Sequence, residues 1–208
     1  MSNAIAIGVL LTAALLSLIT YVLVQEVRAQ RHWRGLVRGG DEGAIRTLVD
    51  EAMQGWRRGR PPKGVSVSVW GGVQSAEIVD ADSLDMRLST AAEGQYAGLG
   101  KDRKEVSSPL QEGMKVFMKL AEMCLYDIPN IRFDRIQVDV YTTFRHEDGS
   151  AVQRCILTGV VPRDDVIEVD WERDTPEAFA KRVGATYKVD RQRRPQPIEA
   201  VPLVGSAP

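Results

Sequence analysis

Few of the side chains that carry out enzyme chemistry occur in this chain in arrangements that would let them act together. The only histidines are His32 and His146, and the only cysteines are Cys124 and Cys155. Zinc or haem ligation needs several such residues at short spacing, and the sequence has no CxxC or histidine-rich segment. A Ser-His or Cys-His pair is not expected either, because His32 follows a membrane segment and His146 falls at a hairpin tip. We therefore predict no enzyme activity, no catalytic residue, no metal and no cofactor. In a reducing compartment the two cysteines should be free thiols, with a disulfide as the alternative.

The glycine-rich segment from Thr90 to Ser107 has a superficial likeness to a phosphate-binding loop. Such a loop requires G-x-x-x-x-G-K-[ST]. Gln95 stands in place of the first glycine, and Asp102 in place of the final Ser or Thr. An aspartate there would repel phosphate and could not replace the magnesium-binding hydroxyl. We predict a flexible surface loop that is available for contacts.

The segment after Pro162 is rich in acidic residues but does not match a calcium loop. A calcium loop needs a glycine turn and ligands at alternate positions, and neither is present. We expect these carboxylates to lie on a solvated face, with a docking patch for a basic partner as the alternative. The acidic residues are Asp164, Asp165, Glu168, Asp170, Glu172, Asp174 and Glu177.

An unbroken apolar run, Ala4 to Val24, precedes the first charged side chain, Glu26. A helix of this length covers ~30 Å at ~1.5 Å per residue, which matches the hydrocarbon core of a bilayer. We predict an uncleaved signal anchor that spans the membrane once. A signal peptide cleaved after Ala29 is the alternative, but the run lacks a basic n-region and is longer than a usual signal core.

The charge distribution predicts an orientation for this anchor. Residues 25–63 contain nine Lys/Arg and five Asp/Glu, a net charge of +4, whereas residues 64–208 contain eighteen and twenty-three, a net charge of −5. Basic flanks remain in the cytoplasm, so we expect the N-terminus outside and the rest of the chain inside. The basic collar suits anionic lipid headgroups, and the acidic remainder argues against nucleic acid as a partner.

Two sets of residues in the anchor and collar are candidates for contacts. Small residues recur every four positions and would let another transmembrane helix approach closely, unless they only reflect the usual composition of membrane spans. These helix-packing residues are Ala4, Gly8, Thr12, Ala13 and Ser17. Aromatic and basic residues prefer the inner membrane interface. These interface residues are Tyr21, Arg28, Arg31, Trp33, Arg34 and Arg38.

A second, amphipathic helix is predicted for residues 41–58, after a break at Gly39-Gly40. Asp41 can cap its N-terminus, and two arginines complement its C-terminus. Its apolar stripe faces either the core of the following domain or the bilayer surface. The stripe consists of Ile45, Leu48, Val49, Ala52 and Trp56.

The remaining body alternates between strand patterns and one long helix. Val65 to Val69 alternates apolar and polar residues before Gly71-Gly72, which predicts a tight hairpin, and Leu84 to Leu88 predicts a third strand. Ser108-Pro109-Leu110-Gln111 has a capping box with proline at the first position, which predicts a helix over residues 109–126.

A second hairpin is predicted around Asp148-Gly149, with strands of about ten residues. The expected register places Ile136 opposite Val161, Val140 opposite Leu157 and Thr142 opposite Cys155. Thr175-Pro176-Glu177 predicts a short helix that ends at Gly184. We therefore expect an α+β fold in which an antiparallel sheet of about five strands packs on one long helix.

These patterns divide the chain into a transmembrane anchor (1–27), a basic collar with an amphipathic helix (28–63), an α+β domain (64–190) and a proline-rich extended tail (191–208). A single span, a body without enzyme chemistry and an extended tail are typical of a non-catalytic accessory subunit of a membrane protein complex. The expected partners are integral-membrane subunits and the lipid bilayer. The alternative is a membrane-tethered ligand-binding or sensory module with a pocket between sheet and helix.

Overall fold

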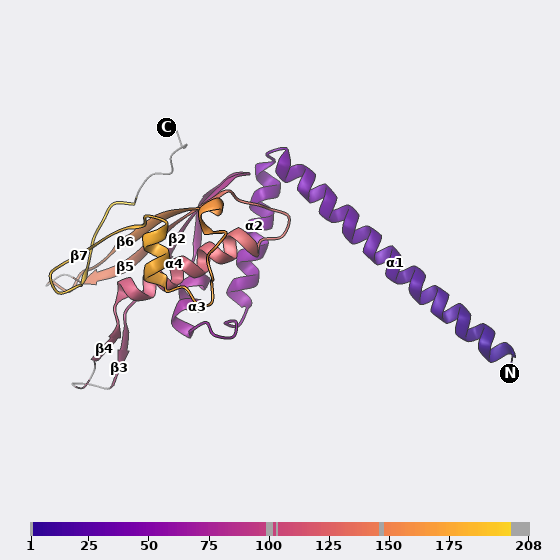
Figure 1. Cartoon of the computed structure of the whole chain (residues 1–208), viewed down its shortest axis with the longest axis horizontal. Coiled ribbons are helices and arrows are strands. Elements are labelled where there is room, and N and C mark those ends of the chain that lie inside the picture. The colour runs from indigo at the N-terminus through magenta and orange to yellow at the C-terminus, as the bar shows by residue number, and fades with distance from the viewer. Residues whose placement is uncertain (1, 99–101, 103, 146–147, 201–208) are drawn as a thin grey trace.

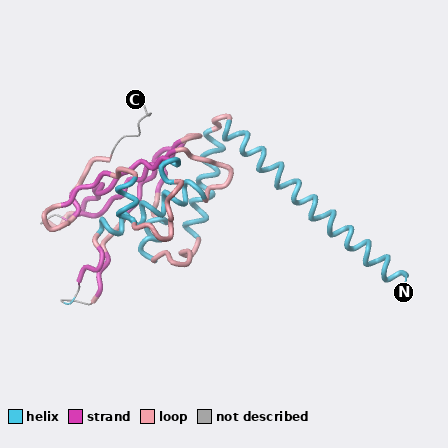
Figure 2. Tube along the Cα trace, in the orientation of Figure 1, coloured by secondary structure: helices cyan, strands magenta, loops and turns pink. Residues whose placement is uncertain are grey.

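The computed structural model describes residues 2–98, 102, 104–145 and 148–200, and it consists of one long helix attached to an α+β body. Helix α1 (Ser2–Arg38) projects from the body as a single rod, with the N-terminus at its far end (Figure 1). The body places its helices on one side of a sheet, as the tube in Figure 2 shows. The predicted single apolar helix and mixed α+β body are confirmed.

Helix α2 (Glu42–Arg58) follows a turn at Gly39-Gly40, where Gly40 has a φ of +73°. The side chain of Asp41 accepts a hydrogen bond from the Ala44 backbone amide at 2.9 Å, so the predicted cap is present. The apolar stripe is buried in the core of the body or packed against it. Of the two uses that the sequence left open, α2 therefore packs on the domain.

The hairpin predicted around Gly71-Gly72 is wrong, because this segment forms helix α3 (Val67–Gln74). Ser66 acts as an N-cap by accepting a hydrogen bond from the Val69 amide. The alternation of valines imitated a strand, but Val69 and Val73 form a buried helical stripe while Val67 is 80% exposed. Contact with a neighbouring helix therefore overrides the local strand pattern.

The main sheet has six strands, which lie side by side in the order β1-β2-β5-β6-β7-β8. They are β1 (Glu77–Ala81), β2 (Asp85–Ala91), β5 (Arg135–Arg145), β6 (Ala151–Pro162), β7 (Thr186–Val189) and β8 (Pro195–Gln196). The sheet is mixed, since β2 and β5 run parallel, which corrects the expectation of an antiparallel sheet of about five strands. The chain returns from β2 to β5 through a helix, and such a crossover places two strands parallel.

The predicted hairpin of β5 and β6 is present, with one difference in register. Val140 lies opposite Leu157 and Ile136 opposite Val161, as predicted. A bulge after Val140 then places Cys155 opposite Tyr141 and not opposite Thr142. The extra residue is Ile156, and a bulge of this kind leaves little signal in the alternation of a sequence.

Helix α4 (Pro109–Tyr126) crosses the sheet and has the predicted bounds and capping box. Helix α4 and the sheet approach each other closely at two glycines, Gly113 and Gly159. A Cβ atom added to Gly159 of β6 would lie 2.8 Å from Cζ of Phe117, and one added to Gly113 would lie 3.2 Å from Cγ1 of Val140. The layer between α4 and the sheet is therefore filled by side chains.

Smaller elements complete the body. Residues 90–107, predicted as a loop, include the end of β2 and a separate two-stranded sheet formed by β3 (Gln95–Ala97) and β4 (Lys104–Ser107). Gly100 and Lys101 lie outside the described residues, as does His146. After β6 come a 3-10 helix, η2 (Arg163–Val166), and the predicted short helix α5 (Pro176–Arg182). Beyond β8, the Ile198 amide bonds to the Cys155 carbonyl at 2.9 Å.

Candidate functional site

The apolar half of α1 is the largest exposed apolar surface among the described residues. A window within Leu10–Arg38 has a mean hydropathy of 1.8, and none of it is buried. Its exposed large side chains include Leu10, Leu11, Leu15, Leu16, Leu18, Ile19, Val22, Leu23 and Val24. Water disfavours such a surface, so lipid or protein must cover it. The chain thus has one N-terminal helix that is long and apolar enough to span a membrane.

The small residues of α1 lie on this exposed segment. Space around Gly8 is open, since a Cβ added there would meet no atom within 4 Å. The hydroxyl of Thr12 donates to the Gly8 carbonyl at 2.9 Å, so its polar group is already satisfied within the helix. Ala13 and Ser17 are also exposed, while the side chain of Ala4 lies outside the described part of the chain. Helix packing through these residues stays a prediction.

The predicted interface residues divide into two groups along α1. Tyr21, Arg28 and Arg31 are exposed, and the Tyr21 hydroxyl accepts a hydrogen bond from Gln25 at 3.1 Å. Trp33 is half-buried and packs against the core of the body. The part of α1 that includes Tyr21, Arg28 and Arg31 therefore makes no contact that would bury these side chains, whereas the last turns of α1 pack on the body.

The end of α1 forms a hollow with two loops of the body. Arg34 and Arg38 line it together with Arg132, which precedes β5, and its volume is about 500 Å³. Nε of Arg34 donates to Oδ1 of Asn130 at 3.3 Å. Sequence reasoning identified Arg34 and Arg38 but missed Arg132 and Asn130, because long-range folding brings the latter two to α1.

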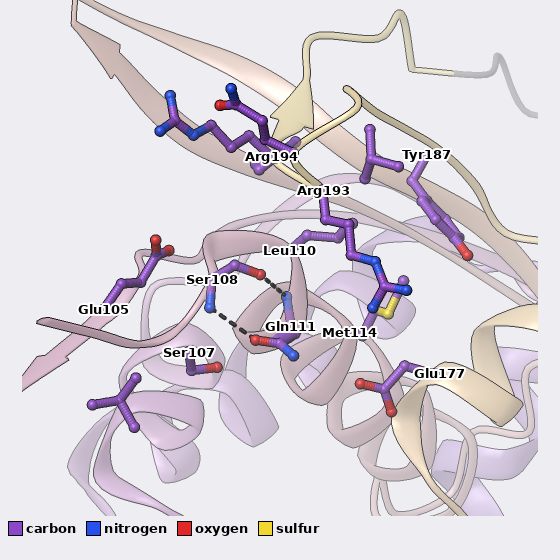
Figure 3. A pocket seen from close by; sticks show the side chains of 14 residues that line it. Glu105, Ser107, Ser108, Leu110, Gln111, Met114, Glu177, Tyr187, Arg193 and Arg194 are labelled. Atoms are coloured by element: carbon purple, nitrogen blue, oxygen red, sulfur yellow. Dashed lines mark hydrogen bonds between the residues drawn. The ribbon is translucent and has the colours of Figure 1, made fainter.

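A larger open groove, about 900 Å³, lies at the N-terminus of α4 between β4, α5 and β7. Ser108 and Gln111 bond reciprocally at its floor, which gives the capping box drawn in Figure 3. The Arg193 side chain extends into the groove over Met114, while Arg194 points away from it (Figure 3). Arg193 has a φ of +61°, a conformation that is uncommon outside glycine and asparagine.

Two buried carboxylates are fully engaged in hydrogen bonds. Asp139 accepts from Thr158 at 2.6 Å, from Gln137 at 3.0 Å and from Arg87 at 2.8 Å. Glu112 accepts from Ser68 and from Lys115, each at 2.7 Å. These hydrogen bonds join strands to each other and α3 to α4.

The pKa of Glu112 reflects opposing effects. Burial raises the pKa of this carboxyl, but hydrogen bonds from Lys115, Ser107 and Ser68 outweigh burial and hold the pKa below its ordinary value of 4.5. Burial raises the pKa of the Cys155 thiol to about 11 and raises the pKa of Cys124 further still. Both cysteines are free and buried, so at neutral pH they are protonated thiols and poor nucleophiles.

The described residues contain no cluster of three or more His, Cys, Asp or Glu side chains that could hold a metal ion. Comparisons with models of protein families, with curated protein sequences and with solved structures found no match to this chain.

Proposed function

We propose that this protein is a non-catalytic accessory subunit of a larger membrane protein complex, anchored by α1. The observation that carries the proposal is the continuity of α1 with the body. Its apolar half is exposed, while Val37 is buried and Trp33 packs against the core. Because the end of α1 packs on the body, the placement of α1 in a membrane would also fix the placement of the body. A subunit of an assembly requires such a fixed placement.

The chemistry of the buried polar groups supports a role in structure more than one in catalysis. Catalytic groups are usually poised near the operating pH, and a nucleophile usually has an activating partner. Here Glu112 stays ionised through its hydrogen bonds and the Cys155 thiol stays protonated. Each group therefore serves the packing of neighbouring elements.

The proposed orientation places the N-terminus outside and the body in the cytoplasm. Arg28, Arg31, Arg34 and Arg38 follow the apolar segment, and basic residues stay on the cytoplasmic side. Anionic headgroups at that side would attract the basic collar. Integral-membrane subunits would contact the exposed face of α1 around Gly8 and Thr12.

A membrane-tethered ligand-binding or sensory module is the second candidate. The close contacts of Phe117 with Gly159 and of Val140 with Gly113 argue against a pocket between the sheet and α4. The open groove beside Arg193 is the observation that favours this second function, since both polar side chains and the apolar Leu110 and Met114 line it.

The test of the proposed function is purification of the full-length protein in mild detergent, followed by mass spectrometry of what remains bound. We expect a fixed set of membrane proteins in stoichiometric amounts. The double variant G8L/T12L should lose them, because larger side chains prevent close approach of a second helix. The control L10I changes the other side of α1 and should retain them. Recovery of a lone monomer would contradict the proposal and favour the ligand-binding module.

A further inference from the structure

We propose that the hollow between α1 and the body is a binding site for a phosphate group. It lies where the last turns of α1 meet the turn between β1 and β2 and the loop before β5. Four of the residues that line it could hold an anion: Arg34, Arg38, Asn130 and Arg132. This inference does not depend on the accessory-subunit proposal.

The charge of the hollow is the first observation. Among the described residues, those that line it carry three positive charges and no negative one. None of the three arginines forms an ion pair within 4 Å with a described residue. The carboxylate of Asp82, on the adjacent turn, is already bonded to the Leu84 and Asp85 amides, each at 2.7 Å. Three guanidinium groups around one opening repel one another, and an anion would relieve this repulsion.

The arrangement of donors is the second observation. Because Nε of Arg34 donates to Oδ1 of Asn130, the amide nitrogen of Asn130 becomes a further donor at the edge of the hollow. Asn130 has a φ of +65°, and this turn directs the chain into Ile131 and Arg132. Guanidinium groups bind phosphate through paired N–H donors, which gives both strength and geometry. The hollow has a volume of about 500 Å³, which leaves room for a phosphate group.

Beyond the lining residues, the neighbourhood carries charges of both signs. Burial lowers the pKa of Arg163, and among its charged neighbours Arg132 lowers this pKa whereas Asp134 and Asp164 raise it. The positive charge that would attract an anion is therefore that of the three lining arginines.

The phosphate could belong to a lipid headgroup or to a free molecule. Arg34 lies ten residues beyond Val24, which is ~15 Å along a helix, whereas the headgroup layer is only ~5–8 Å thick. If α1 stood perpendicular to the membrane, the hollow would lie beyond the layer of lipid phosphates, which would favour a free ligand. A strongly tilted α1 would bring lipid phosphates within reach.

The experiment is native mass spectrometry of the full-length protein in a neutral detergent. Pyrophosphate is added in one arm, and short-chain phosphatidylglycerol in the other, with phosphatidylcholine as the zwitterionic reference. We expect a one-to-one adduct with pyrophosphate or with phosphatidylglycerol, and the arm in which it appears identifies the source. The single variants R34Q, R38Q and R132Q should each weaken binding about tenfold, since each removes a charge-assisted contact.

The matched control is R58Q, which removes an exposed arginine from the last turn of α2 and should change binding less than twofold. If neither arm gives an adduct, or if the triple variant R34Q/R38Q/R132Q retains it, the arginines only complement the end of α1 and the proposal is wrong. All four positions are exposed, so these variants should fold. Loss of subunit partners in the purification experiment would leave this result unaffected.

Discussion

The carboxylate of Asp139 lies in the middle of the sheet, on the face away from α4, and is 1% exposed. We expect D139A to lower the free energy of unfolding by about 3 kcal/mol, because it removes a buried carboxylate that accepts hydrogen bonds from Arg87, Gln137 and Thr158. The measurement is urea unfolding followed by circular dichroism in a neutral detergent. The control E122A removes the half-buried ion pair between Lys119 and Glu122 on α4 and should cost less, about 0.5 kcal/mol. Equal effects of the two variants would contradict the importance of burial.

The hydrogen-bonded Glu112 predicts a dependence of stability on pH. Its pKa is lower in the folded protein than the ordinary value of 4.5, so its contribution is present above that value and is lost as the pH falls through the folded-state pKa. We expect E112Q to be about 1–2 kcal/mol less stable than the wild type at neutral pH. The difference should shrink as the pH falls below about 4.5. Unfolding by urea at a series of pH values measures this, and a difference independent of pH would overturn the assignment.

At the scale of elements, two adjacent glycines in α3 have opposite expected effects. A Cβ on Gly72 would lie 2.5 Å from Cγ2 of Val116 on α4, whereas one on Gly71 would meet nothing within 4 Å. We expect G72A to destabilise the protein by about 1–3 kcal/mol through overpacking. G71A should stabilise it by roughly 0.5–1 kcal/mol, because alanine favours a helix.

The same glycine pair separates the helix from the hairpin that the sequence suggested. In a two-residue hairpin turn, one or both glycines would need a positive φ, so the alanine variant at such a position would be destabilised. Thermal unfolding of the two variants under identical conditions is sufficient. A destabilised G71A would argue for the turn and against α3.

The elements that the sequence predicted well are those whose signals are local. The capping box at Ser108 and the Asp148-Gly149 turn define α4 and the β5–β6 hairpin through neighbouring residues alone. The parallel pairing of β2 with β5 and the helical state of residues 67–74 depend on contacts with distant segments, which a local pattern does not contain. The basic hollow shows the same division, since Arg34 and Arg38 belong to a recognisable collar while Arg132 joins them only through folding.

At the scale of the whole molecule, α1 connects an exposed apolar segment to the body through few intervening residues. The turn at Gly39-Gly40 reverses the chain directly into α2, whose stripe is buried. The orientation of α1 in a membrane would therefore determine which side the entire body occupies, and the basic collar is the part of the sequence that controls it.

The role of the basic collar in setting the orientation of α1 leads to a prediction about topology. In the wild type, a fluorescent protein fused to the C-terminus should be bright, and alkaline phosphatase at the same place should be inactive, because the former folds in the cytoplasm and the latter outside it. Placing lysines before the apolar segment and neutralising the collar beside it, in the variant S2K/N3K/R28Q/R31Q, removes the charge asymmetry. We expect at least part of the population to insert with the body outside, which raises phosphatase activity.

The control is S2Q/N3Q/R57Q/R58Q, which alters the same number of positions but leaves the collar next to the apolar segment intact. It should keep the wild-type orientation, since charges far from the end of a span contribute little. Phosphatase activity in the wild type would place the body outside and overturn the proposed orientation. Release of the fusion protein from the membranes by carbonate extraction would instead indicate that the apolar segment does not span the membrane. The two results differ because the first concerns the direction of α1 and the second concerns its insertion.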